Sequence, residues 1–141
     1  MRKTLVVSLA LAAQVFAGGF YLQLGNPEAS AEARTLGAVL TVKATGCHDP
    51  ATAKLTATAI GEVNGQRRAV PLEVKNLSEP GMFALVGSWP KDGKWAIELS
   101  ATNGEQFTNT LVSAGPDGLD RLHAKANLKK FTPAEVDAML R

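Results

Sequence analysis

The residues of this chain that are best suited to chemistry stand together at Cys47, His48 and Asp49. A thiolate and an imidazole are ligands that copper and zinc accept, and the second histidine completes a candidate metal set of Cys47, His48 and His123. Paired Cys-x-x-Cys motifs are absent. Because free cysteine usually serves as a small buried hydrophobe, we expect a structural role for Cys47 and no bound cofactor, with metal handling or thiol–redox chemistry at this loop as the alternative.

Motifs of nucleophilic catalysis are missing from the sequence. The segment Gly87-Ser88-Trp89 lacks the second glycine of a nucleophile elbow. Cys47 and His48 cannot act as a papain-like pair, because such partners are distant in sequence and meet only in the fold. We therefore expect that the protein is not an enzyme.

Glutamates form the other candidate set, because glycosidase-type chemistry needs two carboxyl groups at a fixed separation. That separation is a distance in space, which a sequence does not give. Glu73, Glu98 and Glu105 fall at outward phases of expected strands. Since glutamate is rarely buried, we expect these three side chains on a solvated face.

The N-terminus has the pattern of an export signal. Two basic residues precede an apolar run over Leu5–Ala13, and small residues follow up to Ala17. The alternative is an uncleaved anchor helix that continues to Leu24, but glycines at Gly18-Gly19 interrupt it short of a comfortable membrane span. We expect residues 1–17 to be removed and the protein to be exported to the periplasm or the exterior.

Charge and cysteine content narrow the range of partners. The chain has 15 basic and 13 acidic residues, and removal of residues 1–17 takes away two basic ones, so the mature net charge is 13 − 13 = 0. The only basic doublets outside the signal are Arg67-Arg68 and Lys129-Lys130. Binding of nucleic acid needs more phosphate-neutralising charge than this, and we expect neither a nucleic-acid nor a membrane partner after cleavage. One cysteine excludes an intramolecular disulfide.

Alternating apolar and polar residues predict a series of short strands separated by turns. The dipeptide Asn64-Gly65 is the strongest hairpin signal, Asn103-Gly104 repeats it, and Pro71 argues for an edge strand or a bulge. In the strand after Asn103-Gly104, Phe107 and Leu111 are expected to face inward. The predicted strands are Phe20–Leu24, Leu36–Ala44, Lys54–Val63, Gln66–Asn76, Met82–Trp89, Trp95–Ala101 and Glu105–Ser113.

The stretch Met82–Ala101 is expected to organise the core. Its two runs meet across Pro90–Gly93, which predicts a β-hairpin, and both tryptophans of the chain flank that turn. Aromatic side chains bury the largest areas, so Trp89 and Trp95 should lie at the centre of the core.

The remaining segments are expected to be loops or short helices. Residues 29–34 are predicted to form one helical turn or a crossing loop, and Gly46–Pro50 a loop. Residues 119–128 are predicted to be irregular, with a final strand or a short helix as alternatives. Thr132 and Glu135 form a capping box that predicts a short C-terminal helix.

Short strands without intervening helices predict an all-β fold, an antiparallel sandwich of about seven strands with a short C-terminal helix. Three segments carry a resemblance to a known type of domain: Pro80-Gly81-Met82-Phe83, Trp89-Pro90 and Gly93-Lys94-Trp95, within a looser likeness over residues 24–112. They resemble the paired strands of small exported bacterial immunoglobulin-like domains, of the carboxypeptidase-regulatory-like, transthyretin-like and YtkA-like groups. This resemblance implies a sandwich outside the cytoplasm and brings no catalytic residue with it.

Together these patterns predict a signal peptide at 1–17, a β-sandwich domain at 18–128 and a helical tail at 129–141. We expect a non-catalytic exported module with a binding or accessory role in the cell envelope, since a sandwich holds its loops on a rigid frame. Its partner would be an unidentified protein, glycan or other envelope component. The alternative function is the metal-handling or thiol–redox role of Cys47 and His48.

N-terminal sequencing of the exported protein should begin at Gly18, because the small residues before it suit a signal peptidase. The measurement requires protein recovered from exporting cells. Recovery of intact Met1 in the membrane fraction would contradict cleavage and favour the anchored alternative.

Overall fold

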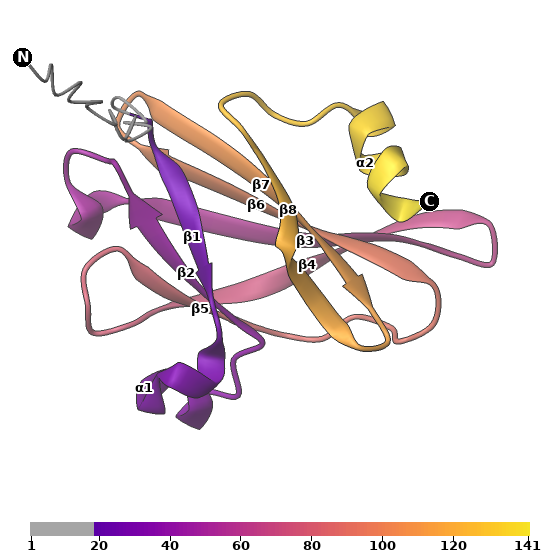
Figure 1. Cartoon of the computed structure of the whole chain (residues 1–141), viewed down its shortest axis with the longest axis horizontal. Coiled ribbons are helices and arrows are strands. Elements are labelled where there is room, and N and C mark those ends of the chain that lie inside the picture. The colour runs from indigo at the N-terminus through magenta and orange to yellow at the C-terminus, as the bar shows by residue number, and fades with distance from the viewer. Residues whose placement is uncertain (1–18) are drawn as a thin grey trace, which may run out of the picture.

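The computed structural model describes residues 19–141, so the predicted signal peptide at 1–17 lies outside the described residues. Eight strands form one antiparallel sheet in the order β1-β2-β5-β4-β3-β6-β7-β8, and this sheet is curled into a nearly closed barrel (Figure 1). The edge strands β1 and β8 contact one another where the barrel fails to close. The strands are β1 (Tyr21–Gly25), β2 (Leu40–Thr45), β3 (Lys54–Val63), β4 (Gln66–Asn76), β5 (Met82–Val86), β6 (Lys94–Asn103), β7 (Gln106–Gly115) and β8 (Gly118–Asn127).

Short helices connect or cover the strands. Among the described residues, α1 (Ala31–Thr35) follows a 3-10 turn at Pro27–Ala29, a second 3-10 turn spans Pro50–Thr52, and α2 (Pro133–Leu140) ends the chain. Both the N-cap of α1, Ser30, and the N-cap of α2, Thr132, accept a hydrogen bond from a backbone N–H of the first turn. The predicted capping box of α2 is confirmed, and residues 31–35 are helix instead of loop.

The antiparallel β class and the C-terminal helix are confirmed, but the predicted pair of sandwich sheets is corrected to one continuous sheet. Strand β4 makes the connection, because Gln66–Leu72 pairs with β3 and Glu73–Asn76 pairs with β5. Pro71 therefore lies in the half of β4 that pairs with β3 alone, as its missing N–H requires.

The predicted hairpin over Met82–Ala101 is wrong. Strand β5 pairs with β2 and β4, whereas β6 pairs with β3 and β7, so residues 87–93 cross between two separate parts of the sheet. Alternation predicted correctly that Phe83 and Leu85 of β5 and Trp95 and Ile97 of β6 are buried. Alternation fixes which face of a strand is buried, but it does not fix which strand lies beside it.

The two hairpins that the Asn-Gly dipeptides predicted are present in the structure. Asn64 and Gly65 both have positive φ, 52° and 76°, as a type I′ turn between β3 and β4 requires. Between β6 and β7 the turn residues are Gly104 and Glu105, one position later than predicted, with φ of 60° at Gly104 as in a type II′ turn. Asn103 consequently remains in β6, and its side chain is buried.

The main core fills the inside of the barrel. Trp95 is only 1% exposed, and its ring lies so close to Gly61 of β3 that any side chain added at Gly61 would overlap the indole. The indole N–H donates a hydrogen bond to the Asp92 carbonyl at 3.0 Å, which satisfies its one polar group. The other large side chains that are fully buried with it are Leu40, Val42, Leu85, Ile97, Leu99 and Val112.

A second, smaller core lies outside the barrel under α2. Leu111 is fully buried there against Phe131 and Val136, so its predicted inward orientation is wrong. Because α2 covers this face, adjacent residues Leu111 and Val112 are both buried, one on each side of β7. An ion pair between Arg67 and Asp137 ties α2 to β4.

Residues 119–128, predicted to be irregular, largely form the edge strand β8. Asp120 pairs with Ser113 and Lys125 with Leu111, so the four residues between Asp120 and Lys125 lie opposite Val112 as a bulge. Most side chains of β8 are exposed. An edge strand with few buried residues has little apolar alternation, which is why the sequence did not predict it clearly.

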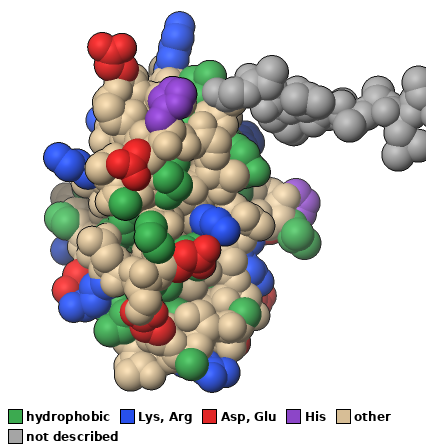
Figure 2. All heavy atoms as spheres, turned by 90° about the vertical axis from the view of Figure 1, so that its left-hand side faces the viewer, with side chains coloured by type: hydrophobic (Ala, Val, Ile, Leu, Met, Phe, Trp, Pro, Cys, Tyr) green, Lys and Arg blue, Asp and Glu red, His purple; other side chains and the backbone are tan. Residues whose placement is uncertain are grey.

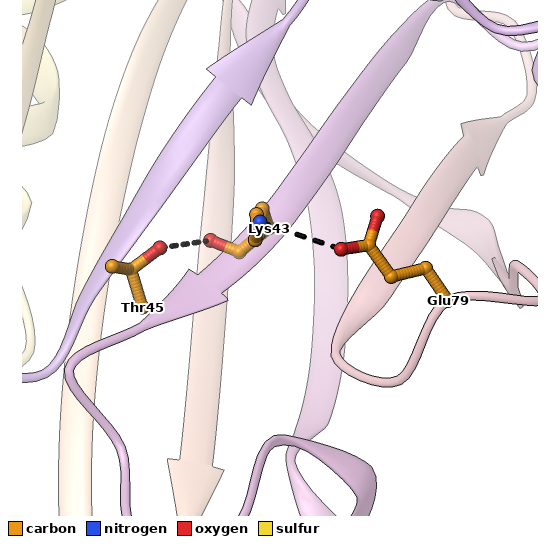
Figure 3. A network of polar contacts seen from close by, with 3 residues as sticks. All are labelled: Lys43, Thr45 and Glu79. Carbon is orange, nitrogen blue, oxygen red and sulfur yellow. Dashed lines mark hydrogen bonds and ion pairs between the residues drawn. The ribbon is translucent and has the colours of Figure 1, made fainter.

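On the outside of the sheet, polar contacts connect β2 to the turn that precedes β5 (Figure 3). The Lys43 Nζ lies 3.4 Å from Glu79 Oε1, and the Thr45 hydroxyl donates to the Lys43 carbonyl at 3.5 Å. Both charged side chains are exposed, so this pair adds little stability. The stronger restraint on this turn is the backbone bond from the Ala44 N–H to the Gly81 carbonyl at 2.8 Å.

Replacing Trp95 with alanine should lower the free energy of unfolding by about 3–5 kcal/mol, as deletion of a large buried aromatic does. Chemical denaturation measures this change. Leu122→Ala is the control, because Leu122 is 93% exposed and its loss should cost less than about 0.5 kcal/mol. A loss below about 1 kcal/mol in Trp95→Ala would contradict the packing described here.

Candidate functional site

The loop that carries Cys47 and His48 is fixed at its far side by Asn103 of β6. The Asn103 amide donates to the Asp49 carbonyl at 2.5 Å and to the Thr52 hydroxyl at 3.1 Å, and its oxygen accepts from the Asp49 N–H at 3.4 Å. A buried asparagine is thus satisfied by the loop backbone. Asn103 belongs to the predicted turn dipeptide Asn103-Gly104, and in the structure its side chain holds the loop of Cys47 and His48 in place.

Cys47 and His48 have different surroundings within this loop. Cys47 is half-buried and packs against the main core, as expected for a small hydrophobe. His48 is exposed, and its backbone N–H donates to Gln106 Oε1 at 3.3 Å. The loop therefore presents the imidazole to solvent and turns the thiol toward the core.

The structure does not bring His123 to Cys47 and His48. His123 lies in the bulge of β8, 79% exposed, with Nδ1 2.8 Å from Asp120 Oδ2. The bulge lies opposite Val112 of β7, six residues from Gln106, and six residues of strand span about 20 Å. Within residues 19–141, no three side chains of His, Cys, Asp or Glu gather as a metal site would need.

The three glutamates lie in separate places. Glu73 is exposed on β4 and pairs with Lys75 at 3.1 Å, and Glu105 is exposed in the β6–β7 turn. Glu98 is half-buried on the outer face of β6, where it accepts a hydrogen bond from the Asn109 amide at 3.3 Å. The expectation of a solvated face holds for Glu73 and Glu105 and is corrected for Glu98, because the buried Asn109 beside it needs an acceptor.

A hollow lies at the end of the barrel where β8 begins, and we call it the tryptophan hollow. It has a volume of about 220 Å³ and is formed by the β5–β6 loop, the β7–β8 turn and the residue before β2. Trp95 is its buried wall, and Trp89 is half-buried beside it. Its lining residues are Val39, Gly87, Ser88, Trp89, Lys91, Gly93, Trp95, Ala114, Gly115, Pro116 and Gly118.

Glycines give this hollow its shape. Gly87, Gly93 and Gly118 have φ of 146°, 83° and 104°, a range that other residues rarely adopt. A side chain at Gly93 would also meet the Glu62 carbonyl of β3 at 2.6 Å. The loops around the hollow therefore depend on glycine at these positions.

The sequence placed both tryptophans at a turn, but only the fold brings Val39 and residues 114–118 to them.

A second hollow lies at the opposite end of the barrel, between the start of β1 and the end of β8. It is larger, about 620 Å³, and its walls include Phe20, Tyr21, Thr108 and Leu128. It also borders Gly19, the first described residue. The lining of the tryptophan hollow lies wholly within residues 39–118.

Charge is mixed over the face of the molecule that Figure 2 shows. Acidic and basic side chains alternate there with hydrophobic ones, without a broad patch of one sign. Such a face offers no continuous track for a phosphate backbone. Among residues 19–141, no helix has both the length and the apolar character needed to cross a bilayer.

Comparisons with known proteins give no relative from which a role can be transferred. No protein-family model matches the chain, and neither a curated protein nor a solved structure is found to be similar to it. The resemblance to small exported immunoglobulin-like domains stays a prediction.

Titration of the protein with Cu(I) and Zn(II) under reducing conditions should give only background binding, and Cys47→Ser and His48→Ala should not change it. The reason is that the loop offers one exposed imidazole, with no further ligand from the described residues to complete a site. Isothermal calorimetry provides the measurement. Stoichiometric, tight binding that is lost in Cys47→Ser would contradict this, and loss in His123→Ala as well would show that His123 reaches the same loop.

Proposed function

We propose that the protein is an exported, non-catalytic module that binds a single-ring group in the tryptophan hollow and serves an accessory role in the cell envelope. The observation that carries this proposal is a hollow with two tryptophans in its lining, held by loops on a rigid barrel. Binding residues are often found on loops that a rigid scaffold positions. Export is supported by the signal-like N-terminus of the sequence.

The volume of the hollow limits the size of the group that it can hold. A cavity of roughly 150 Å³ admits benzene, and ligand pockets for larger molecules span roughly 300–1,000 Å³. The tryptophan hollow, at about 220 Å³, falls between these limits. It therefore suits one aromatic or similar ring, carried by a small molecule or by the side chain of a partner.

The lining of the hollow suits the same group. Trp89 is half-buried and supplies the accessible aromatic surface, which favours offset or edge-to-face contact with another ring, while Trp95 is the buried wall behind it. Glycine backbone at Gly115 and Gly118 lets a ligand approach closely, since no side chain stands in the way. Ser88 and Lys91 are the polar side chains of the lining and would orient a ring that carries a hydroxyl or a carbonyl.

The side chains that line the hollow favour a binding role over a catalytic one. Its lining contains no cysteine, histidine or carboxylate side chain, so it lacks a nucleophile–base pair. Ser88 is the one hydroxyl in the lining, and no histidine accompanies it. The proposal is therefore that the hollow binds a ring-containing group and does not catalyse a reaction.

Titration with p-cresol should shift the indole N–H signals of Trp89 and Trp95 in ¹H–¹⁵N spectra, because both residues line the hollow. Gly115→Leu should abolish these shifts. Gly115 lies in the lining, a side chain there meets no atom within 4 Å, and its φ is not in the strained range, so leucine can fill the space without distorting the backbone.

The control is Thr102→Leu, which adds leucine at an exposed position of β6 beyond the lining. It should bind p-cresol as the natural protein does. Unchanged indole signals in the natural protein, or equal shifts in Gly115→Leu and Thr102→Leu, would overturn the proposal.

A further inference from the structure

Basic residues gather along β8 and the segment that follows it. Residues 121–130, here called the β8 strip, contain Arg121, Lys125, Lys129 and Lys130 and no acidic residue. All four side chains belong to exposed residues. The chain after residue 17 has 13 basic and 13 acidic residues, so nine basic and 13 acidic residues remain outside the strip. A neutral chain is thus divided into a strip of +4 and a remainder of −4.

The four cations of the strip are not neutralised by the chain itself. None of them forms an ion pair with any residue from 19 to 141, where the pairs are Lys43–Glu79, Arg67–Asp137, Lys75–Glu73 and His123–Asp120. Residues 1–18 contain no aspartate or glutamate, so they supply no partner either. The charge of the strip is therefore available to an external anion.

Exposed leucines interrupt the basic residues of the strip. Leu122, at the bulge, is 93% exposed, and Leu128, just after β8, is 63% exposed. The large hydrophobic residues that are exposed in the described chain are these two and Tyr21. Tyr21 and Leu128 both line the second hollow, so the C-terminal end of the strip forms part of that hollow.

Protection of the sheet edge explains only part of this pattern. Lysines and bulges on an edge strand prevent it from pairing with other chains, and β8 has both. That role gives no reason for a leucine with almost its whole side chain in water. Cations beside exposed apolar side chains are instead the composition of segments that lie on anionic membranes.

We propose that the β8 strip docks the protein on an anionic lipid surface, with Arg121, Lys125, Lys129 and Lys130 against the headgroups and Leu122 and Leu128 entering the interface. The proposal is independent of the tryptophan hollow. It revises the expectation of no membrane partner after signal cleavage. Net charge averages over the whole surface, whereas the structure places two of these cations on the edge strand β8 and the other two in the exposed segment that directly follows it.

Flotation with vesicles tests this contact, using the protein as it is purified from exporting cells. The protein should float with vesicles of equal parts phosphatidylglycerol and phosphatidylcholine and stay behind with pure phosphatidylcholine. Lys129→Gln/Lys130→Gln should weaken binding about 30-fold, because each surface cation contributes about a factor of five. Leu122→Ser/Leu128→Ser should weaken it by about tenfold or more, through lost apolar burial.

The matched control is Lys54→Gln/Arg68→Gln, which removes two exposed cations outside the strip that form no ion pair. Its binding should stay within about twofold of the natural protein, since these cations lie off the strip. All variants keep the same N-terminus, so any contribution of residues 1–18 cancels between them. Absence of binding to anionic vesicles, equal weakening in the control, or full binding by the leucine variant would overturn the proposal.

Discussion

The packing of Trp95 against Gly61 is the contact on which the rest of the structure depends. It brings β6 against β3 with no side chain between the indole and the β3 backbone. The indole N–H then fixes the β5–β6 loop through the Asp92 carbonyl. The same ring is the buried wall of the tryptophan hollow. One side chain thus links the core of the barrel to the shape of its candidate binding end.

Much of the fold was predictable because alternation and turn chemistry are local signals. The bounds of β3 and β4 follow from alternation and from Asn64-Gly65, whose two positive φ angles few other dipeptides adopt. The Pro90–Gly93 segment closes no hairpin, although Gly93 also has a positive φ, and the strands on either side of it pair with other neighbours. Partners that are distant in sequence are chosen by packing, which a single sequence does not display.

The candidate site was less predictable than the fold. Two potential metal ligands, Cys47 and His48, are adjacent in the sequence, yet the loop turns the thiol toward the core and leaves the imidazole exposed. The tryptophan hollow is instead assembled from Val39, the β5–β6 loop and the β7–β8 turn. Its chemistry lies in shape and aromatic surface, and the only trace of it in the sequence was the pair of tryptophans around a glycine-containing turn.

Intermolecular nuclear Overhauser effects between bound p-cresol and the natural protein test the central claim most directly, because they locate the ring without altering any residue. The account predicts contacts from the p-cresol ring protons to the side chains of both Trp89 and Trp95, since both line the hollow. Contacts to Tyr21 and Leu128 alone would place the ring in the second hollow and contradict the account.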